Sequence, residues 1–532
     1  MSQAFLSLCG LFPSATTVGV AQAHYKTMPT RYKKWVTQQT LVDYLCSKDR
    51  RSIYWHDYEA GGISARSDAP LQHAALRTDE ELRYLDEPID WYCQLAGDKL
   101  PHPEAIAITQ INPLHCQENG LSEPVFFRRI NQEMSNPGSC VAGYNSIKYD
   151  EEMTRFGLWR NQIPVYDREF RNNNSRWDLL PLAAAVYALA PSAIDWPIKE
   201  ETGLVSLRLE DIAKQNNIAQ DNAHNAVDDV KATIDVARLF KQSAPDIWDF
   251  SYQHRNKRAI SHHLAPGKIS LLVQTVLGAE NAFVSPVLII GWHPLDKSRV
   301  VGVKLRDIDA LRRCYKIPTE EIIKRLYARK EDLERAERKR PPLTTIKVNA
   351  CPAVFPLSMI THSPALMERV GFDPNETQTI AHKIFNHQPF IDKLMATYNE
   401  NLFKNKDVVD ADIALYSAGF ADGIDKINLQ RMQTMPTDVA FSPASDWVWK
   451  QPVFKTLWER ASAKCLPLTD NSEEKQQWWD YCKHRLQQPV TEGERCVNFT
   501  NVDAAIVASE LTGELKAQYI QYIEELKKTL RI

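Results

Sequence analysis

The sequence predicts an α/β protein made of three successive regions, and three observations support this fold class. Its 532 residues exceed what one hydrophobic core organises, so two to four domains are expected. Hydrophobic residues make up 44% and charged residues 25%, as in ordinary globular proteins. Strand and helix patterns alternate over residues 50–244, strands dominate over 245–357, and helices dominate over 358–532. We expect these three ranges to be domains, with residues 1–49 as a flexible extension.

The first region contains the alternating strand and helix patterns. The segments RSIYWHDYE, QHAALRT and RYLDEPIDWYCQ have the composition of strands, and residues 79–81 form a polar turn before the third. SCVAGYN is typical of a buried strand. Helical patterns lie near residues 121–135, 150–160, 178–188 and 206–215. A last helix, NAVDDVKATIDVARLFKQ, carries an apolar stripe and ends before Pro245.

The second and third regions differ from the first in their patterns. KISLLVQTVL, VSPVLIIGWHP, RVVGVKLRDI and TTIKVNACPAVF predict a small sheet or barrel, with a helical insertion near 317–339. Helical patterns then follow at 376–387, 390–402, 408–418, 454–464, 474–488 and 503–530. The fold class is therefore a mixed α/β region, a β-rich region and an all-helical region.

Several classes of protein are disfavoured by composition. No run of about 18 apolar residues is present, so no membrane span is expected, and the first residues lack the basic start of a secretory signal. The ten cysteines are scattered without a C-x-x-C pair or zinc spacing. Dispersed thiols are typical of a reducing compartment, so we expect a cytoplasmic protein.

Charge is distributed unevenly along the chain. The net charge is −3, but residues 245–348 hold 20 Lys and Arg against 12 Asp and Glu. The remainder is correspondingly acidic. This asymmetry suits a protein in which one region contacts phosphates and another holds metal ions.

Asp57 and Glu59 form a D-x-E pattern at the end of the first expected strand. Because side chains alternate along a strand, these two carboxylates should lie close together on one face. Carboxylates held this close repel each other unless a cation neutralises them. A divalent cation with oxygen ligands is the expected partner.

Two further segments contribute candidate residues. Asp150 follows the strand SCVAGYN and begins the next expected helix. His224 and Asp229 belong to HNAVDD, an H-x-A-x-x-D pattern in which His224 precedes the last helix and Asp229 lies in its first turns. The spacing from His224 favours Asp229 over Asp228 as a ligand.

Four carboxylates and one imidazole form a set that can hydrolyse phosphodiester bonds. Two Mg²⁺ or Mn²⁺ ions about 4 Å apart can hold the scissile phosphate and activate a water molecule. A neutral imidazole can take the proton of that water as a general base. We therefore expect Asp57, Glu59, Asp150 and Asp229 as metal ligands and His224 as the base.

These motifs resemble the DEDDh 3′→5′ exonuclease superfamily, whose D-x-E, N-x-x-x-[FY]-D-type and H-x-A-x-x-D motifs occur here in order. The segments HDYEAGG, GYNSIKYDEEMTR, NNNSRWDLL, SLRLEDIAKQN, NAHNAVDDVKATI, HRNKR, GWHP and KVNACP are similar to the bacterial exodeoxyribonuclease I family. The resemblance covers about residues 50–360 strongly and the tail loosely. It implies a ribonuclease H-like mixed-sheet exonuclease domain, then a β-rich, barrel-like domain and a helical C-terminal domain.

The resemblance also implies an activity and partners. The chain would degrade single-stranded DNA from its 3′ end to 5′-mononucleotides with Mg²⁺, in DNA repair and recombination. It would act as a monomer and dock the C-terminal tail of single-stranded-DNA-binding protein. The residues expected to contact the bound strand are Glu59, Arg208, His254, Arg255 and Lys257. Deleting the helical tail is expected to shorten the run of cleavages per encounter.

Other interpretations stay open at this point. Arg208 could pair only with Glu210 or Asp211, and the HRNKR run could be a solvated face. An RNA-trimming exonuclease of the same superfamily would carry the same motifs. A non-catalytic single-strand-binding module is a third possibility, although such a module would be expected to have lost a ligand.

Overall fold

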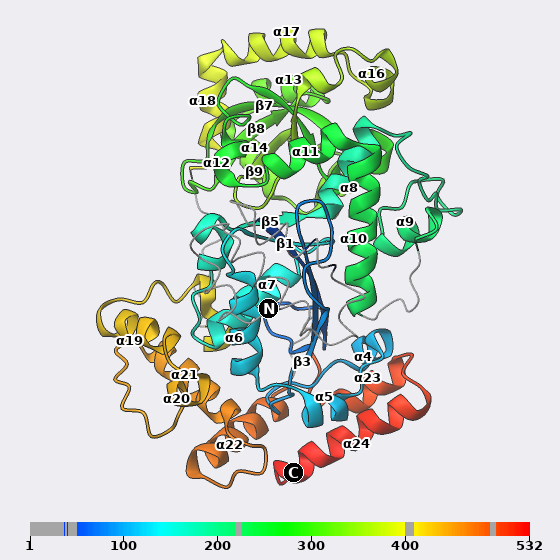
Figure 1. Cartoon of the computed structure of the whole chain (residues 1–532). Coiled ribbons are helices and arrows are strands. Elements are labelled where there is room, and N and C mark those ends of the chain that lie inside the picture. The colour runs from blue at the N-terminus through cyan, green and yellow to red at the C-terminus, as the bar shows by residue number, and fades with distance from the viewer. Residues whose placement is uncertain (1–36, 38–39, 41–50, 219–225, 400–408, 490–495) are drawn as a thin grey trace, which may run out of the picture. The chain divides into compact units, whose positions relative to one another are not determined.

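The computed structural model of the chain describes residues 37, 40, 51–218, 226–399, 409–489 and 496–532 (Figure 1). It contains two compact units. The described residues of the first unit come from Met1–Ser175, Gln220–Ile234 and Val408–Ile532, and those of the second from Arg176–Ala219 and Asp235–Asp407. Within the described residues, no helix has the length and hydrophobicity needed to cross a membrane.

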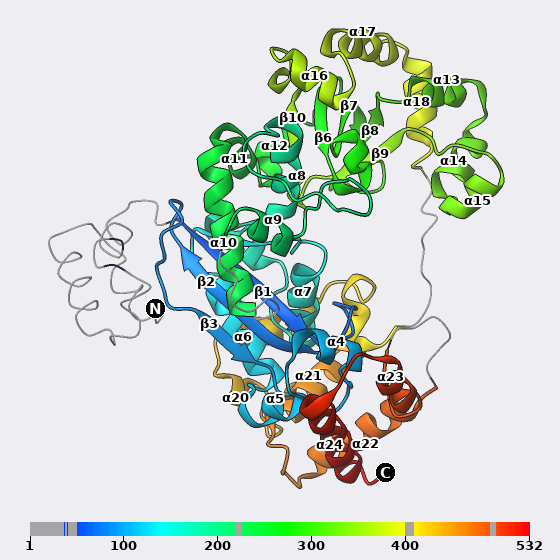
Figure 2. The same ribbon diagram turned by 90° about the vertical axis from the view of Figure 1, so that its right-hand side faces the viewer.

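The first unit is organised around a mixed sheet with the strand order β3-β2-β1-β4-β5. The strands are β1 (Ser52–Ala60), β2 (Pro70–Thr78), β3 (Ile89–Tyr92), β4 (Ser139–Gly143) and β5 (Ser175–Asp178), and the division between the units falls within β5. The central strand β1 runs antiparallel to β2 and parallel to β4. Figure 2 shows β1, β2 and β3 side by side. The expected mixed sheet is confirmed.

Two strands differ from the sequence prediction. The third strand begins only at Ile89, because Pro88 before it has no N–H to donate to the ladder. The short strand β5 was missed, since four residues give too little alternation to recognise.

Helices α6 (Glu123–Met134) and α7 (Asp150–Arg160) build one core with the sheet. Tyr54 and Tyr58 from β1 belong to the same buried cluster as Phe126, Phe127 and Met153 from the helices. Because Tyr54 and Tyr58 alternate with the acidic positions of β1, their burial fixes which face of the strand looks inward.

The C-terminal helices share a hydrophobic core with this unit. Helices α22 (Glu473–Gln487) and α24 (Gly513–Thr529) bury Trp478 and Tyr519 in a cluster with Leu71 and Ile106, which belong to β2 and α4 (Pro103–Thr109). The Tyr519 hydroxyl donates to the Pro101 carbonyl at 2.7 Å. Figure 1 shows α24 beside α5 (Pro113–Asn119), in agreement with their contacts. The sheet and the tail therefore depend on each other for burial of apolar side chains.

The second unit contains an antiparallel sheet with the order β10-β6-β7-β8-β9. Its strands are β6 (Ile269–Val273), β7 (Val284–Trp292), β8 (Arg299–Lys304), β9 (Leu343–Lys347) and β10 (Val354–Pro356). Leu288 and Val301 of this sheet pack with Ala381 and Leu394 of α17 (Pro374–Phe385) and α18 (Gln388–Ala396). The expected β-rich region is confirmed, and helices beyond residue 357 cover it.

Some expected helices are divided. The 317–339 pattern forms α14 (Thr319–Tyr327) and α15 (Lys330–Arg335), separated by the extended residues Ala328 and Arg329. The 503–530 pattern forms α23 (Val502–Ala508) and α24, which begins at Gly513 with a φ of 61° that interrupts a right-handed helix. Further helices include α8 (Leu179–Leu189), α9 (Leu209–Gln215), α10 (Ala226–Ser243), α11 (Pro245–Gln253), α12 (Lys257–Ser261), α13 (Ile308–Lys316), α16 (Pro364–Val370), η6 (Ala411–Tyr416), α19 (Gly423–Gln433), α20 (Thr437–Ala440) and α21 (Pro452–Cys465).

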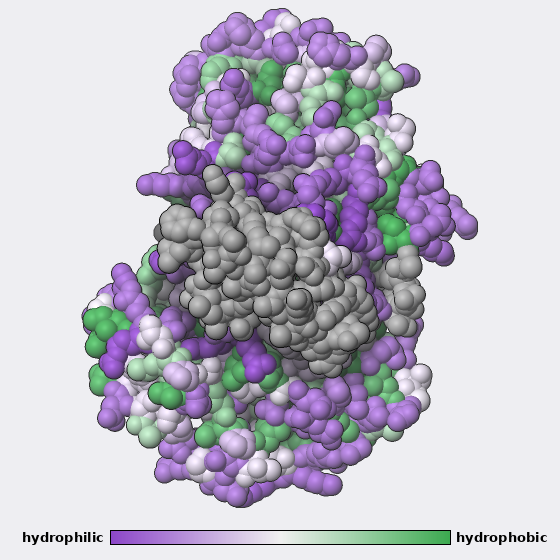
Figure 3. Space-filling model, viewed as in Figure 1, coloured by the Kyte–Doolittle hydropathy of each residue, from purple (hydrophilic) through white to green (hydrophobic). Residues whose placement is uncertain are grey.

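The described surface is mostly polar. Figure 3 shows hydrophilic residues over most of the coloured face, with small hydrophobic groups between them. Around α19 the exposed apolar side chains include Phe420, Ile424 and Ile427. Small groups of this kind are ordinary on protein surfaces.

Candidate metal centre

The D-x-E pair lies on the central strand of the first sheet. Strand β4 pairs with β1 only as far as Trp55, so Asp57 and Glu59 stand beyond that ladder, opposite Ala74 and Gln72 of β2. Both acidic side chains are partly exposed, whereas Tyr58 between them is buried. The strand therefore directs its two carboxylates to one face and its tyrosine to the other, as the alternation predicts.

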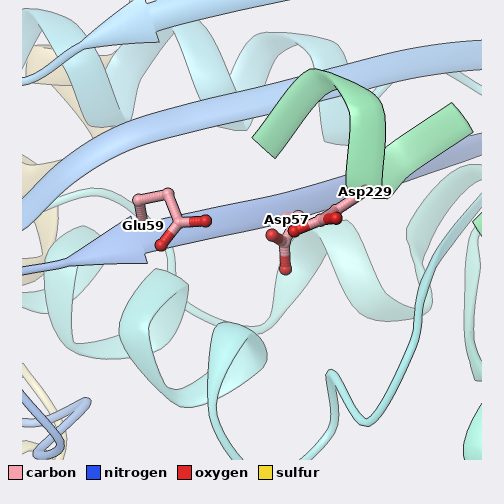
Figure 4. Close-up of side chains that lie close together, drawn as sticks. All are labelled: Asp57, Glu59 and Asp229. Atoms are coloured by element: carbon pink, nitrogen blue, oxygen red, sulfur yellow. The ribbon is translucent and has the colours of Figure 1, made fainter. Parts of the chain in front are cut away.

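Asp229 joins this pair from a distant part of the chain. It lies near the start of α10, and ligand atoms of Asp57, Glu59 and Asp229 all lie within 4.8 Å of one another (Figure 4). Asp228 instead pairs with Lys231 at 2.7 Å. The structure thus distinguishes the two adjacent aspartates of the motif, with Asp229 in the cluster.

The electrostatics of the cluster favour a cation. Burial, together with the charge of Asp229, raises the pKa of Asp57 to about 7. Burial, then the charges of Asp57 and Asp229, raises the pKa of Glu59 to about 9. The carboxylates of Asp57 and Glu59 are therefore harder to ionise than ordinary carboxylates, and a cation bound beside them would offset the unfavourable charge. Oxygen-only ligands suit a hard divalent ion, so the donor set fits such a metal.

Asp150 contacts the same strand without belonging to the three-carboxylate group. It is the first residue of α7 and is buried. The Tyr58 backbone N–H donates to its Oδ1 at 3.3 Å, which places this carboxylate against β1 between the two acidic positions. Of the five residues predicted for the site, His224 lies outside the described residues.

The residues expected to contact a nucleic-acid strand, other than Glu59, lie in the second unit. Arg208 is exposed and pairs with Glu210 at 2.5 Å, one of the two acidic neighbours considered above. His254 faces His263 with 3.1 Å between their Nε2 atoms, and Arg255 stacks 3.7 Å above the Tyr252 ring. Lys257 begins α12 and is exposed. Contact of Arg208, His254, Arg255 and Lys257 with a nucleic-acid strand stays a prediction.

Three aromatic residues near the motifs are structural. Trp55, Trp159 and Trp177 are buried, so their rings belong to the cores and are not open to bases. Sequence reasoning missed the support that Tyr58 and Thr154 give to Asp150: the hydroxyls of Tyr58 and Thr154 lie 3.0 Å apart, and Thr154 donates to the Asp150 carbonyl at 2.9 Å. The alternation of β1, which turns Tyr58 toward the inner face, was the available signal.

Three family models match successive parts of the chain. The Exonuclease model matches residues 54–237, the Exonuclease I SH3-like domain model matches 255–400, and the Exonuclease I C-terminal domain model matches 409–529. The first match includes all three carboxylates of the cluster.

Curated relatives cover most of the chain. Exodeoxyribonuclease I of Haemophilus influenzae is 36% identical over 391 residues, which are 73% of this chain and 81% of the relative. Exodeoxyribonuclease I of Escherichia coli K12 is 33% identical over 446 residues, which are 83% of this chain and 90% of the relative.

Solved structures of exonuclease I are similar in fold, and the first two described here are from Escherichia coli. The complex with a dA16 oligonucleotide has a TM-score of 0.78 at 29% identity, covering 90% of this chain and all of the other. A zinc-bound complex with single-stranded DNA has a TM-score of 0.78 at 28% identity, covering 90% and 99% of the two chains. A structure described as single-stranded-DNA-binding protein/exonuclease I with an inhibitor has a TM-score of 0.73 at 28% identity, again covering 90% and 99%.

Proposed function

The chain belongs to the exodeoxyribonuclease I family, and from this premise we propose how its own residues carry out the reaction. It is a metal-dependent 3′→5′ exonuclease that degrades single-stranded DNA to 5′-mononucleotides, in DNA repair and recombination. The observation that carries the proposal is the meeting of Asp57, Glu59 and Asp229 in one partly buried group.

Four carboxylates of this chain would hold the metal. Ligand atoms of Asp57, Glu59 and Asp229 lie close enough together to bind one cation. The carboxylate of Asp150 accepts a hydrogen bond from the backbone N–H of Tyr58, which lies between the first two residues. We propose two Mg²⁺ ions there, with Mn²⁺ as a substitute, because the donors are all oxygen. Such ions lower the pKa of an attacking water and neutralise charge on the leaving oxygen.

The protein supplies proton transfer and positioning around that metal. His224 would accept the proton of the attacking water at a ring nitrogen, which a neutral imidazole can do near pH 7. The pKa values of Glu59 and Asp57 are raised because burial and neighbouring charge disfavour their ionised forms. Binding of cations would favour the ionised forms and so release protons from these carboxylates. Glu59, Arg208, His254, Arg255 and Lys257 are proposed to contact the strand.

Binding of partners follows from charge and from the family. The excess of Lys and Arg over residues 245–348 supports contact with the DNA backbone and with the C-terminal tail of single-stranded-DNA-binding protein. We expect the protein to act as a monomer, which sedimentation will measure. The described cysteines are all free thiols, which supports a reducing, cytoplasmic setting.

A digestion time course tests the activity. Single-stranded DNA labelled at either its 5′ or its 3′ end is incubated with Mg²⁺, with EDTA, and with EDTA followed by excess Mg²⁺. We expect 3′ label to appear at once as mononucleotide, 5′ label to shorten stepwise, and EDTA to stop both reversibly. Loss of the 5′ label first, or digestion in EDTA, would contradict the proposal. A matched oligoribonucleotide distinguishes the RNA-trimming alternative.

A further inference from the structure

The first turn of α7 carries three successive carboxylates, Asp150, Glu151 and Glu152. A helix N-terminus favours negative charge, but three adjacent acids also repel one another. Only Asp150 approaches the metal cluster, through the Tyr58 N–H. Glu151 and Glu152 each form an ion pair with an arginine, and the pair of Glu151 is fully buried.

Glu151 forms a two-pronged ion pair with Arg168 in the interior. Arg168 donates from Nη2 to Oε2 at 2.8 Å and from Nη1 to Oε1 at 3.3 Å, and the side chains are 0% and 1% exposed for Arg168 and Glu151. Glu152, by contrast, bonds Arg155 at 2.7 Å nearer the surface. Two arginine–carboxylate pairs therefore hold the residues that follow Asp150.

Burial of the Arg168–Glu151 pair is expensive. Removing two charges from water costs several kcal/mol per ion in real proteins, and apolar residues of similar volume often serve stability as well. The Nε of Arg168 has no hydrogen-bond partner among the described residues, which adds to the cost. A contact of this kind is better explained by the geometry that it fixes than by the stability that it adds.

The pair is linked to the strand that carries the D-x-E motif. Glu151 Oε1 lies 3.8 Å from Nε2 of His56, the buried residue directly before Asp57. One turn further along α7, Thr154 contacts the Tyr58 hydroxyl. Helix α7 thus contacts the inner face of β1 at two points, through Glu151 and Thr154, while Asp57 and Glu59 stand on the outer face of the same strand.

We propose that Arg168 and Glu151 are positioning residues that hold Asp150 in place as a metal ligand. This inference rests on the proposed role of Asp150. Rotation of the first turn of α7 would move the Asp150 carboxylate relative to Tyr58, and the two-pronged contact between a planar guanidinium and a carboxylate resists that rotation. Residues that orient metal ligands in this way typically change metal affinity by about 10–100-fold when they are replaced.

The same helix provides a matched control at its other end. Arg160, the last residue of α7, forms a buried pair with Glu123 at 2.7 Å, with side chains 1% and 7% exposed. Glu123 also bonds Lys464 at 2.5 Å, so its replacement disturbs more interactions than replacement of Glu151. Both pairs anchor α7, but only the Arg168–Glu151 pair adjoins Asp150.

The experiment compares four full-length variants with the parent protein: Glu151→Gln, Arg168→Lys, Glu123→Gln and Asp150→Asn. Two quantities are measured against Mg²⁺ concentration, the rate of mononucleotide release and the rise in Tm over the value in EDTA. Arg168→Lys keeps the charge and removes the two-pronged geometry, and it decides the question if Glu151→Gln does not fold.

We expect Glu151→Gln and Arg168→Lys to raise the half-saturating Mg²⁺ concentration by about tenfold or more, with most of the rate recovered at saturation. Glu123→Gln should lower the Tm in EDTA but leave the Mg²⁺ midpoint unchanged. Equal shifts in all three variants, or none, would overturn the positioning role. An unshifted midpoint in Asp150→Asn would instead remove Asp150 from the proposed metal site, and the positioning role with it.

Discussion

Replacement of Asp57 by Asn should stabilise the metal-free protein and abolish its response to Mg²⁺. Asn fills nearly the same space without a charge, so the substitution removes a repulsive carboxylate from the cluster with Glu59 and Asp229. The gain is expected only without metal, because the carboxylates are mutually unfavourable only when no cation joins them.

The magnitude follows from the raised pKa. The pKa of Asp57 rises from 3.8 to about 7 on folding, chiefly through burial. Each tenfold change in a dissociation constant is worth about 1.36 kcal/mol, so ionised Asp57 costs the folded state on the order of 4 kcal/mol. In the metal-free parent this destabilising effect of Asp57 is therefore absent below about pH 4 and grows as the pH rises toward about 7. The asparagine side chain of the variant does not titrate, so the advantage of the variant should grow over the same pH range and then level off.

Thermal unfolding in EDTA, at intervals from about pH 5 to about pH 9, measures this effect. At about pH 8 we expect the Tm of Asp57→Asn to exceed that of the parent by a few degrees, and at saturating Mg²⁺ the order should reverse. Asp228→Asn is the matched control, because Asp228 is paired with Lys231 outside the cluster. A difference between Asp57→Asn and the parent that does not change with pH would refute the reasoning.

Three further outcomes are expected. Asp57→Ala should abolish hydrolysis while leaving affinity for a single-stranded oligonucleotide nearly intact, as measured by fluorescence anisotropy in EDTA; retained digestion would exclude this residue as a ligand. His224→Ala should reduce the rate about 10²–10⁴-fold at neutral pH while the Mg²⁺-induced rise in Tm persists, and an unchanged rate would remove it as the base. A chain ending before residue 409 should fail to give a cooperative circular-dichroism transition, because Trp478 and Tyr519 would no longer cover Leu71 and Ile106; a folded but less processive enzyme would contradict this.

The last of these predictions differs from the one drawn from the sequence, which stays a prediction. There, deletion of the helical tail was expected to shorten mainly the run of cleavages per encounter. Its helices instead complete the core beside β2, and Lys464 pairs with Glu123 of α6 at 2.5 Å. An apolar helical stripe predicts that a helix is buried, but it does not identify the surface against which it packs.

Much of the candidate site could be predicted from the sequence, because the positions of its acidic residues depend on local strand and helix patterns. The placement of Asp57 and Glu59 on one face needs only the alternation of a strand, and the place of Asp229 in the first turns of a helix needs only a helical pattern. Asp150 was assigned correctly to the start of α7. Its contact with Tyr58 was not predictable, because that hydrogen bond joins residues 92 positions apart.

By itself, the sequence determined the type of most main elements, the three acidic motifs and the family, because periodicity and short motifs depend on backbone geometry that neighbouring residues share. Only the tertiary structure decided that Asp229 joins Asp57 and Glu59, that burial and mutual repulsion raise the pKa of the β1 carboxylates, and that Arg168 is paired with Glu151 beneath them. These properties arise from segments brought together by packing, and the energies of such contacts depend on burial that no local pattern records.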